Sequence, residues 1–286
     1  MEEADVMKIV YFGTDVFLSC FHYFAKYHEI LALYTYHNDE DYFTEYGIVR
    51  EADRLGIPVH YEDISEETTC KYFTEEGCRL FFVAEYNRLL PVPKELKAFK
   101  GINMHSSLLP VGRSYYPIEA AMERDLKETG VTMHEIASRL DGGAVLDSYR
   151  VEISPERDSI DIYLECAKGA REMIGRMMEK FDEEWNAARE QPEDRRYPYW
   201  KRPKKEKLTI THSMTGKEAK ECFRRYNQLV QVEIGGQEYF IRALDVGNAS
   251  VEEDVRAIRE DMVLYRVQDG HLRLILYIER GGIDET

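Results

Sequence analysis

The chain of 286 residues has no apolar run that approaches the length of a membrane span, and its start, Met1 to Asp5, is acidic where a secretory signal would be basic. We therefore expect no membrane partner and a cytoplasmic protein. Cysteine is scarce, and no pair has C-x-x-C spacing. The five cysteines are Cys20, Cys70, Cys78, Cys166 and Cys222. An odd, scattered set argues against a disulfide framework or a zinc site and favours reduced structural thiols.

Basic residues are also in the minority, with 38 Lys and Arg against 54 Asp and Glu, a net charge of -16 and a pI near 5.1. Such a charge repels polyanions and disfavours nucleic acid as a partner. One basic segment, 191–207, is the exception, and it carries Arg195, Arg196, Lys201, Arg202, Lys204, Lys205 and Lys207 among aromatic residues and prolines. Two interpretations stay open: a solvated, proline-stiffened linker, or a phosphate-contacting edge for a substrate held between two domains.

Strand and helix patterns alternate along the first half of the chain, which with 44% hydrophobic and 12% aromatic residues can bury a large core. Apolar runs at 8–12, 30–35, 58–60 and 80–84 predict strands, and 45–55 and 65–73 predict helices between them. This order is typical of parallel βαβ units with helices on both faces of the sheet. The sequence therefore predicts an α/β fold with a Rossmann-like, parallel-rich sheet.

The second half of the chain predicts a boundary and a smaller domain. Apolar residues recur at helical spacing over 159–181, which indicates a long amphipathic helix that closes a first domain at about residue 190. After the segment 191–207, a helix is expected over 215–227, followed by hairpins over 230–243 and 262–278. The predicted organisation is thus a catalytic domain of residues 1–190, a linker of residues 191–207 and a small β-rich domain of residues 208–286.

Polar residues of complementary chemistry follow the middle of the chain. Asn103 and His105 lie two apart on an expected strand, so their side chains share one face, near the carboxyl end where open parallel sheets bind ligands. Asp141 follows within Leu140-Asp141-Gly142-Gly143. An amide donor, an imidazole and a carboxylate suit acyl transfer, which needs an oxyanion stabiliser and proton transfer. The alternatives are a buried structural histidine and a turn aspartate. His105 and Asp141 alone make a poor metal site, so none is expected.

The loop after the first expected strand excludes one cofactor. Gly13-Thr14-Asp15-Val16-Phe17 lacks the G-x-G-x-x-G pattern that a dinucleotide pyrophosphate needs, so NAD is not expected. The succession N-x-H-x-S-L-L-P, R-x-x-x-P, G-V-T-x-H and L-D-x-G over residues 103–143 resembles the formyltransferases that use 10-formyltetrahydrofolate. The opening F-G-T-x-x-F is similar to that of the methionyl-tRNA and sugar formyltransferases. Specific motifs are confined to residues 100–146.

This resemblance implies roles for single residues. Asn103 would donate to the formyl oxygen, His105 would stabilise the oxyanion and shuttle a proton, and Asp141 would orient His105 and help to deprotonate the incoming amine. His134 would be a supporting or structural residue. The folate would contact Tyr86, Asn87, Arg88, Leu89, Leu90, Leu140, Gly142 and Gly143. The acceptor would contact Ser107, Arg113, Tyr115 and Tyr116.

The chain departs from the family pattern in two places. One is the segment Ser114-Tyr115-Tyr116, where small residues are common, and the other is Ala144. Either tyrosine could stack on the acceptor or pack in the core. We therefore expect an N-formyltransferase with 10-formyltetrahydrofolate as donor and a small-molecule amine as acceptor, a nucleotide-linked amino sugar above all. The alternatives are a methionyl-tRNA formyltransferase, a formyltetrahydrofolate hydrolase, with no domain expected ahead of Lys8, and a non-catalytic folate-binding protein. The oligomeric state stays open, a homodimer included.

Overall fold

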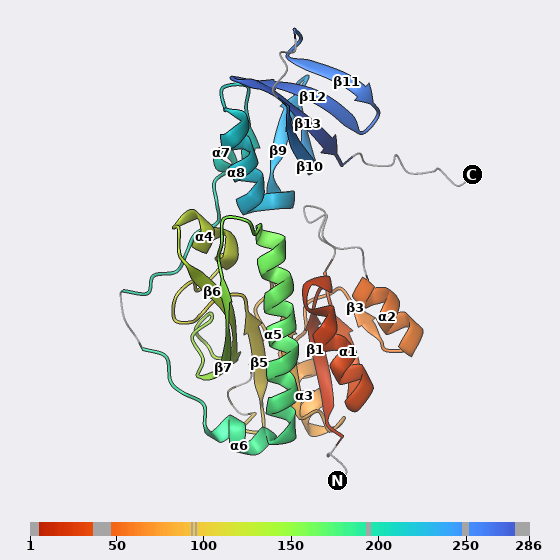
Figure 1. Cartoon of the computed structure of the whole chain (residues 1–286). Coiled ribbons are helices and arrows are strands. Elements are labelled where there is room, and N and C mark those ends of the chain that lie inside the picture. Colours follow the sequence, from red (N-terminus) through yellow and green to blue (C-terminus); the bar gives the residue numbers. More distant parts are fainter. Residues whose placement is uncertain are drawn as a thin grey trace, which may run out of the picture. The chain divides into compact units, whose positions relative to one another are not determined.

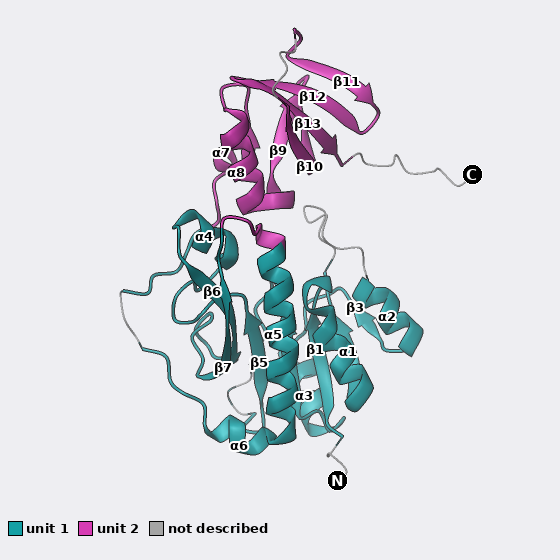
Figure 2. Cartoon of the chain, in the orientation of Figure 1, with its two compact units in different colours: residues 1–154, 161–201 teal, residues 155–160, 202–286 magenta. Residues whose placement is uncertain are grey.

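The computed structural model describes residues 6–36, 47–92, 94, 96–192, 196–247 and 252–277. The chain divides into two compact units (Figure 2), the first formed by residues 1–154 and 161–201 and the second by residues 155–160 and 202–286. Each unit contains its own sheet and its own buried core. The domain limits expected from the sequence stay predictions.

Unit 1 is built on a seven-stranded sheet with the order β3-β2-β1-β4-β5-β6-β7. Its strands are β1 (Lys8–Gly13), β2 (Glu29–Tyr34), β3 (Val59–His60), β4 (Leu80–Ala84), β5 (Gly101–His105), β6 (Glu128–Glu135) and β7 (Val145–Glu152). The pairs from β3 to β5 are parallel, whereas β6 and β7 extend the sheet in antiparallel fashion. This parallel-rich, Rossmann-like sheet confirms the predicted fold class.

Helices cover both faces of this sheet. They are α1 (Leu18–Tyr27), α2 (Gly47–Leu55), α3 (Glu66–Thr74), α4 (Pro117–Glu123), α5 (Ser159–Glu179) and α6 (Phe181–Asn186), with a short 3-10 turn, η1 (Asp15–Phe17), after β1. Helices α1 and α5 lie on one face of the sheet (Figure 1). Buried residues of α1, α2 and α5 share one core with the sheet, and α3 packs on the other face. The hydroxyl of Ser65 accepts from Thr68 N and caps α3, within the helix expected over 65–73.

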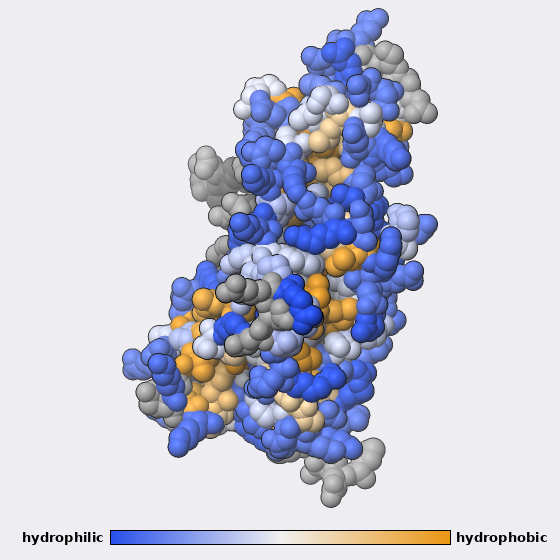
Figure 3. Space-filling view, turned by 90° about the vertical axis from the view of Figure 1, so that its left-hand side faces the viewer, coloured by the Kyte–Doolittle hydropathy of each residue, from blue (hydrophilic) through white to orange (hydrophobic). Residues whose placement is uncertain are grey.

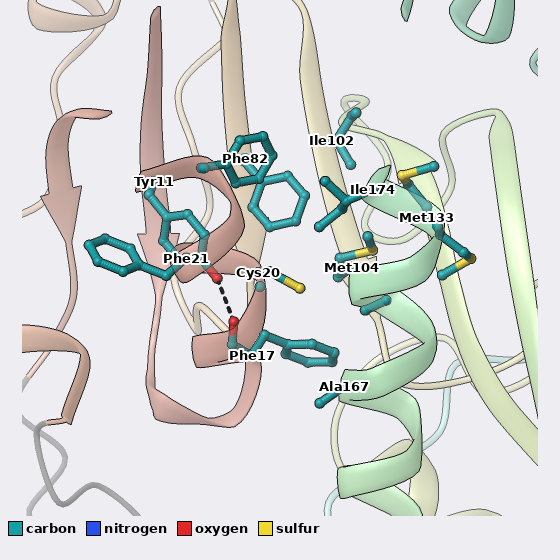
Figure 4. Close-up of a cluster of buried hydrophobic side chains, with 14 of the residues drawn as sticks. Tyr11, Phe17, Cys20, Phe21, Phe82, Ile102, Met104, Met133, Ala167 and Ile174 are labelled. Carbon is teal, nitrogen blue, oxygen red and sulfur yellow. Dashed lines mark hydrogen bonds between the residues drawn. The ribbon is translucent and has the colours of Figure 1, made fainter. Parts of the chain in front are cut away.

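The core under α5 fixes which way β5 and β6 face. Ile102 and Met104 of β5 belong to this core, and Met133 of β6 joins them (Figure 4). Because side chains alternate along a strand, the residues between these apolar positions point to the opposite face of the sheet. The burial of α5 therefore determines the direction of Asn103 and His105 before any polar contact is made.

Unit 2 contains a six-stranded sheet with the order β11-β12-β13-β10-β9-β8, antiparallel except for the pair β8 and β9. Its elements are α7 (Lys205–Leu208), β8 (Thr209–Ile210), α8 (Gly216–Tyr226), η2 (Asn227–Leu229), β9 (Gln231–Ile234), β10 (Gln237–Gly247), β11 (Val255–Arg259), β12 (Met262–Val267) and β13 (Gly270–Leu276). Both expected hairpins are present, although Ile278, the expected end of the second, lies outside the described residues.

Candidate active site

The three expected catalytic residues meet on the face of β5 and β6 that points away from α5. Asn103 Nδ2 lies 3.5 Å from Asp141 Oδ1, and His105 Nδ1 lies 3.7 Å from the same oxygen. β5 supplies the first two residues, and the loop between β6 and β7 brings Asp141 over them. The structure thus places an amide, an imidazole and a carboxylate within reach of one another, and their catalytic roles stay proposals.

His134 on β6 is a fourth member of this group. Antiparallel pairing sets it directly opposite Asn103, with both side chains on the same face. The Glu135 carbonyl can only accept, so His134 Nδ1 donates to it at 2.8 Å, and His134 Nε2 accepts from Asn103 Nδ2 at 3.2 Å. Burial lowers the pKa of His134 to about 4, because the charged form loses its hydration. A neutral histidine acceptor therefore fixes which end of the Asn103 amide faces the site.

The ring of His105 is oriented by the main chain. Nε2 donates to the carbonyl of Gly112 at 2.8 Å, so that Nδ1 is the nitrogen that faces Asp141. Family resemblance assigns the orienting role to Asp141, but at 3.7 Å the carboxylate is an electrostatic neighbour and not a hydrogen-bond partner in this structure. His105 is buried, and 10% of its side chain is exposed.

Asp141 itself is held by backbone groups. Its Oδ2 accepts from Ser114 N at 2.8 Å, and both residues adopt left-handed backbone angles, with φ of 48° at Asp141 and 92° at Ser114. Gly143 is required by packing, since a Cβ there would lie 1.9 Å from the Glu135 carbonyl oxygen. The glycine pair expected to let a cofactor approach thus also lets the loop lie against β6.

Gln191, which no sequence motif indicated, joins the loops of the site. Its Oε1 accepts from Arg113 Nε and Nη2 at 3.2 and 2.7 Å, and its Nε2 donates to the carbonyls of Asp141 and Gly143 at 2.9 and 2.7 Å. Arg113, expected to contact the acceptor, is only 3% exposed. The structure places its guanidinium behind the site, and a role in acceptor binding stays a prediction.

The basic aromatic segment is only partly solvated. Trp200 is buried, and its backbone N donates to the Arg113 carbonyl at 3.0 Å, while Tyr199 Oη donates to the Leu140 carbonyl at 2.9 Å. Arg195 lies outside the described residues. The remaining basic residues of the segment are exposed: Arg196, Lys201, Arg202, Lys204, Lys205 and Lys207. Tyr199 and Trp200 therefore belong to the packing of unit 1.

The remaining residues expected at the acceptor side differ in accessibility. Ser107 is buried and its hydroxyl donates to the Val111 carbonyl at 2.7 Å, within the turn that contains the cis bond between Leu109 and Pro110. Tyr115 is 44% exposed, so its ring is not core packing. Tyr116 precedes α4 with a left-handed φ of 51°. Of these, Tyr115 has the most surface to offer an acceptor.

The loop after β4, expected to receive the pterin, has an inner and an outer side. Tyr86 packs on Phe12, with ring centroids 5.5 Å apart, and Leu90 packs against the same cluster. Arg88 Nη1 donates to the Tyr61 carbonyl and pairs with Asp63, each at 2.8 Å.

The outer side of this loop is open. Asn87 is exposed and Leu89 is 82% exposed, and Leu140 on the Asp141 loop is 40% exposed. Apolar areas lie among hydrophilic ones on the surface of unit 1 (Figure 3). Leu89 and Leu140 therefore offer apolar surface to a ligand.

Two features are absent from the described parts of the chain. No helix there combines the length and the apolar character needed to cross a membrane. Within the same residues, histidines, cysteines and carboxylates form no group of three or more that could hold a metal ion.

The buried, neutral His134 predicts a pH dependence of stability. In the unfolded chain this histidine takes up a proton below about pH 6.5, whereas in the folded chain it does so only near pH 4. The unfolded state therefore binds more protons in this window, and the free energy of unfolding falls as the pH decreases through it. His134→Gln, which keeps an acceptor for Asn103, should remove this part of the decrease.

The measurement is denaturant unfolding of wild type and His134→Gln at pH 7, 6 and 5, with His22→Gln on α1, whose side chain is 52% exposed, as control. The difference in unfolding free energy between wild type and His134→Gln should shift in favour of the variant as the pH falls. Parallel curves would contradict a neutral buried His134.

Comparisons with known proteins agree with this geometry. Residues 56–177 match the sequence model of the formyl transferase family. Among solved structures, HypX from Aquifex aeolicus is 17% identical, with a TM-score of 0.68 over 94% of this chain and 44% of that chain. The chain thus spans less than half the length of HypX.

An N-formyltransferase from Helicobacter canadensis is 18% identical, with a TM-score of 0.57 over 95% of this chain and 100% of that chain. A sugar N-formyltransferase from Shewanella sp. is 15% identical, with a TM-score of 0.59 over 83% and 97% of the two chains. At these identities the structures show a shared fold. The region that matches the formyl transferase family contains Asn103, His105 and Asp141.

Proposed function

We propose that this protein transfers the formyl group of 10-formyltetrahydrofolate to the amine of a small molecule, with a nucleotide-linked amino sugar as the acceptor. The observation that carries this proposal is the convergence of Asn103, His105 and Asp141 on one face of the sheet. They provide an N–H donor, a proton acceptor and a carboxylate, the groups that amine attack on a formyl carbon requires.

Asn103 stabilises the negative charge that develops on the formyl oxygen. One of its N–H groups is held by His134 at 3.2 Å, and the other reaches Asp141 only at 3.5 Å. A hydrogen bond of this length is weak, so the second N–H is the one that turns to a substrate oxygen. His134 keeps the amide nitrogen directed into the site while this happens.

His105 and Asp141 handle the proton that the amine loses. Since Nε2 of His105 is committed to the Gly112 carbonyl, Nδ1 accepts the proton, and the Asp141 carboxylate 3.7 Å away stabilises the resulting positive charge. The same proton then returns to the leaving amine of the folate. The hydrogen bond from Ser114 N to its other oxygen keeps the Asp141 carboxylate in place.

The loops expected to hold the folate suit a flat, partly apolar ligand. Leu89 and Leu140 expose apolar side chains, while Tyr86 and Leu90 pack inward and keep the backbone of the first loop in place. Bound there, the donor would supply an activated formyl group on a secondary amine. The solved structures support this choice, since WlaRD was crystallised with 5-N-formyl-THF and HypX with tetrahydrofolic acid.

The acceptor is proposed from the exposed surface near the site and from the relatives. Tyr115 is exposed and offers a ring for stacking on a base or sugar. WlaRD, a sugar 3N-formyl transferase that is 16% identical, was crystallised with dTDP, and the Helicobacter canadensis enzyme with dTDP-3-aminofucose. The net charge of -16 favours a small acceptor over a polyanion. A cytoplasmic location and a homodimer stay predictions.

His105→Ala and Asp141→Asn should each lower kcat for formyl transfer by at least about a hundredfold, because the first removes the proton acceptor and the second removes the carboxylate that stabilises the protonated imidazole. Affinity for folate should stay within a few-fold, since neither side chain is needed to hold the pterin. Steady-state kinetics and folate titration of the purified variants measure both effects, with His22→Ala on α1 as control. Turnover like that of wild type in either variant would remove the catalytic assignment, and complete loss of folate binding would make the residue a binding residue.

A second prediction separates a nucleotide-sugar acceptor from methionyl-tRNA. A tRNA would be held by many phosphate contacts, so its KM should rise steeply with salt, whereas an amino-sugar nucleotide should show a shallow dependence. Lys204→Glu with Lys205→Glu should weaken a small acceptor by less than about tenfold, because exposed charges contribute about 1 kcal/mol or less.

The assay compares both acceptors at two salt concentrations, with Lys217→Glu and Lys220→Glu on α8 as the matched charge reversal. The methionyl-tRNA reaction would be favoured instead if formylation of the tRNA is sensitive to salt and is abolished by Lys204→Glu with Lys205→Glu but not by the control variant.

A further inference from the structure

We infer that Gln191 is a positioning residue for formyl transfer, which sets the Asp141 carboxylate by joining the Asp141 loop to the Arg113 turn; this inference rests on the proposed function. The amide of Gln191 is 6% exposed and lies between two parts of the site that are far apart in the sequence. It accepts from the Arg113 guanidinium on one side and donates to the carbonyls of Asp141 and Gly143 on the other.

The partners determine the orientation of this amide. The guanidinium can only donate and the two carbonyls can only accept, so a rotated amide would oppose donors to donors and acceptors to acceptors. Both N–H groups and the oxygen of Gln191 are therefore used within the protein. A side chain whose polar atoms are fully satisfied in a buried place holds the loops that it joins.

The joined loops meet again at the carboxylate. Ser114 N, next to Arg113 in the chain, donates to Asp141 Oδ2 at 2.8 Å. Gln191 thus holds the side chain of Arg113, which directly precedes Ser114 in the chain. It also holds the backbone carbonyl of Asp141, the residue whose carboxylate accepts from Ser114 N. Ser114 and Asp141 both have left-handed backbone angles, and such conformations persist only where surrounding contacts hold them in place.

The segment that carries Gln191 is anchored on both sides of it. Arg189 exchanges two backbone hydrogen bonds with Val145, at 2.7 and 2.8 Å, where β7 begins. Trp200 donates to the Arg113 carbonyl, and its ring lies under the Arg124 guanidinium at 4.4 Å. Gln191 therefore lies two residues after a backbone position that is hydrogen-bonded to the start of β7, which supports a positioning side chain.

The test is Gln191→Glu, which keeps the size and the acceptor for Arg113 but places an oxygen against two carbonyls. We expect kcat to fall at least tenfold and the KM for the folate donor to change less than threefold. In a background of Asp141→Asn, the same change should lower kcat less than threefold further, because Gln191 acts through Asp141. Gln191→Met, which is similar in size and uncharged, should lower kcat in the same way and be equally non-additive with Asp141→Asn. The control is Gln237→Glu on the exposed part of β10.

Full additivity of Gln191→Glu and Asp141→Asn, or a wild-type kcat in Gln191→Glu, would overturn the inference. A wild-type protein that transfers no formyl group would instead refute the proposed function, and the positioning claim would then be decided by a crystal structure of Gln191→Met. The claim requires the hydrogen bond between Ser114 N and Asp141 Oδ2 to be broken or displaced in that variant. An unchanged bond would contradict it.

Discussion

The site depends on one buried carboxylate. Asp141 is 7% exposed, and its two oxygens face Ser114 N, the Asn103 amide, His105 and His134. Burying a carboxylate costs free energy unless hydrogen bonds compensate for it. Here the short hydrogen bond, at 2.8 Å, comes from the backbone N–H of Ser114. The other polar groups face this carboxylate but are oriented by separate contacts: His134 directs the nitrogen of the Asn103 amide, and the Gly112 carbonyl fixes His105 with Nδ1 toward Asp141. Asp141 is thus the group that the amide and the imidazole both face.

The sheet explains why these groups share one face. Ile102, Met104 and Met133 are buried in the core under α5, so that the intervening residues must point the other way. Antiparallel addition of β6 next to β5 then brings His134 opposite Asn103, and Thr132 opposite His105. Thr132 Oγ1 donates to the Ser107 carbonyl at 2.6 Å and so ties the turn after His105 to β6. Hydrophobic burial on one face thus positions the chemistry on the other.

Much of this could be predicted from the sequence, because apolar runs such as 80–84 and the periodic pattern from Ser159 reflect local burial. Asn103, His105 and Asp141 were found through their spacing and family resemblance. His134 was recognised as part of a motif, but its contact with Asn103 depends on strand pairing that periodicity does not encode. Gln191 gave no signal, since a glutamine beside a charged, proline-containing segment looks like a linker residue. Its importance comes from a contact 50 residues away along the chain, with the Asp141 carbonyl.

The central claim is that the formyl group passes to an amine and not to water. Incubation with 10-formyltetrahydrofolate that carries an isotopic label in the formyl carbon, with and without amino-sugar nucleotides, tests this directly by mass spectrometry of acceptor and formate. A base oriented for an amine gains its geometry only when the acceptor is bound, so label should appear on the acceptor, and donor consumption without acceptor should be slow. Release of labelled formate at full rate without any amine would contradict the account and identify a hydrolase.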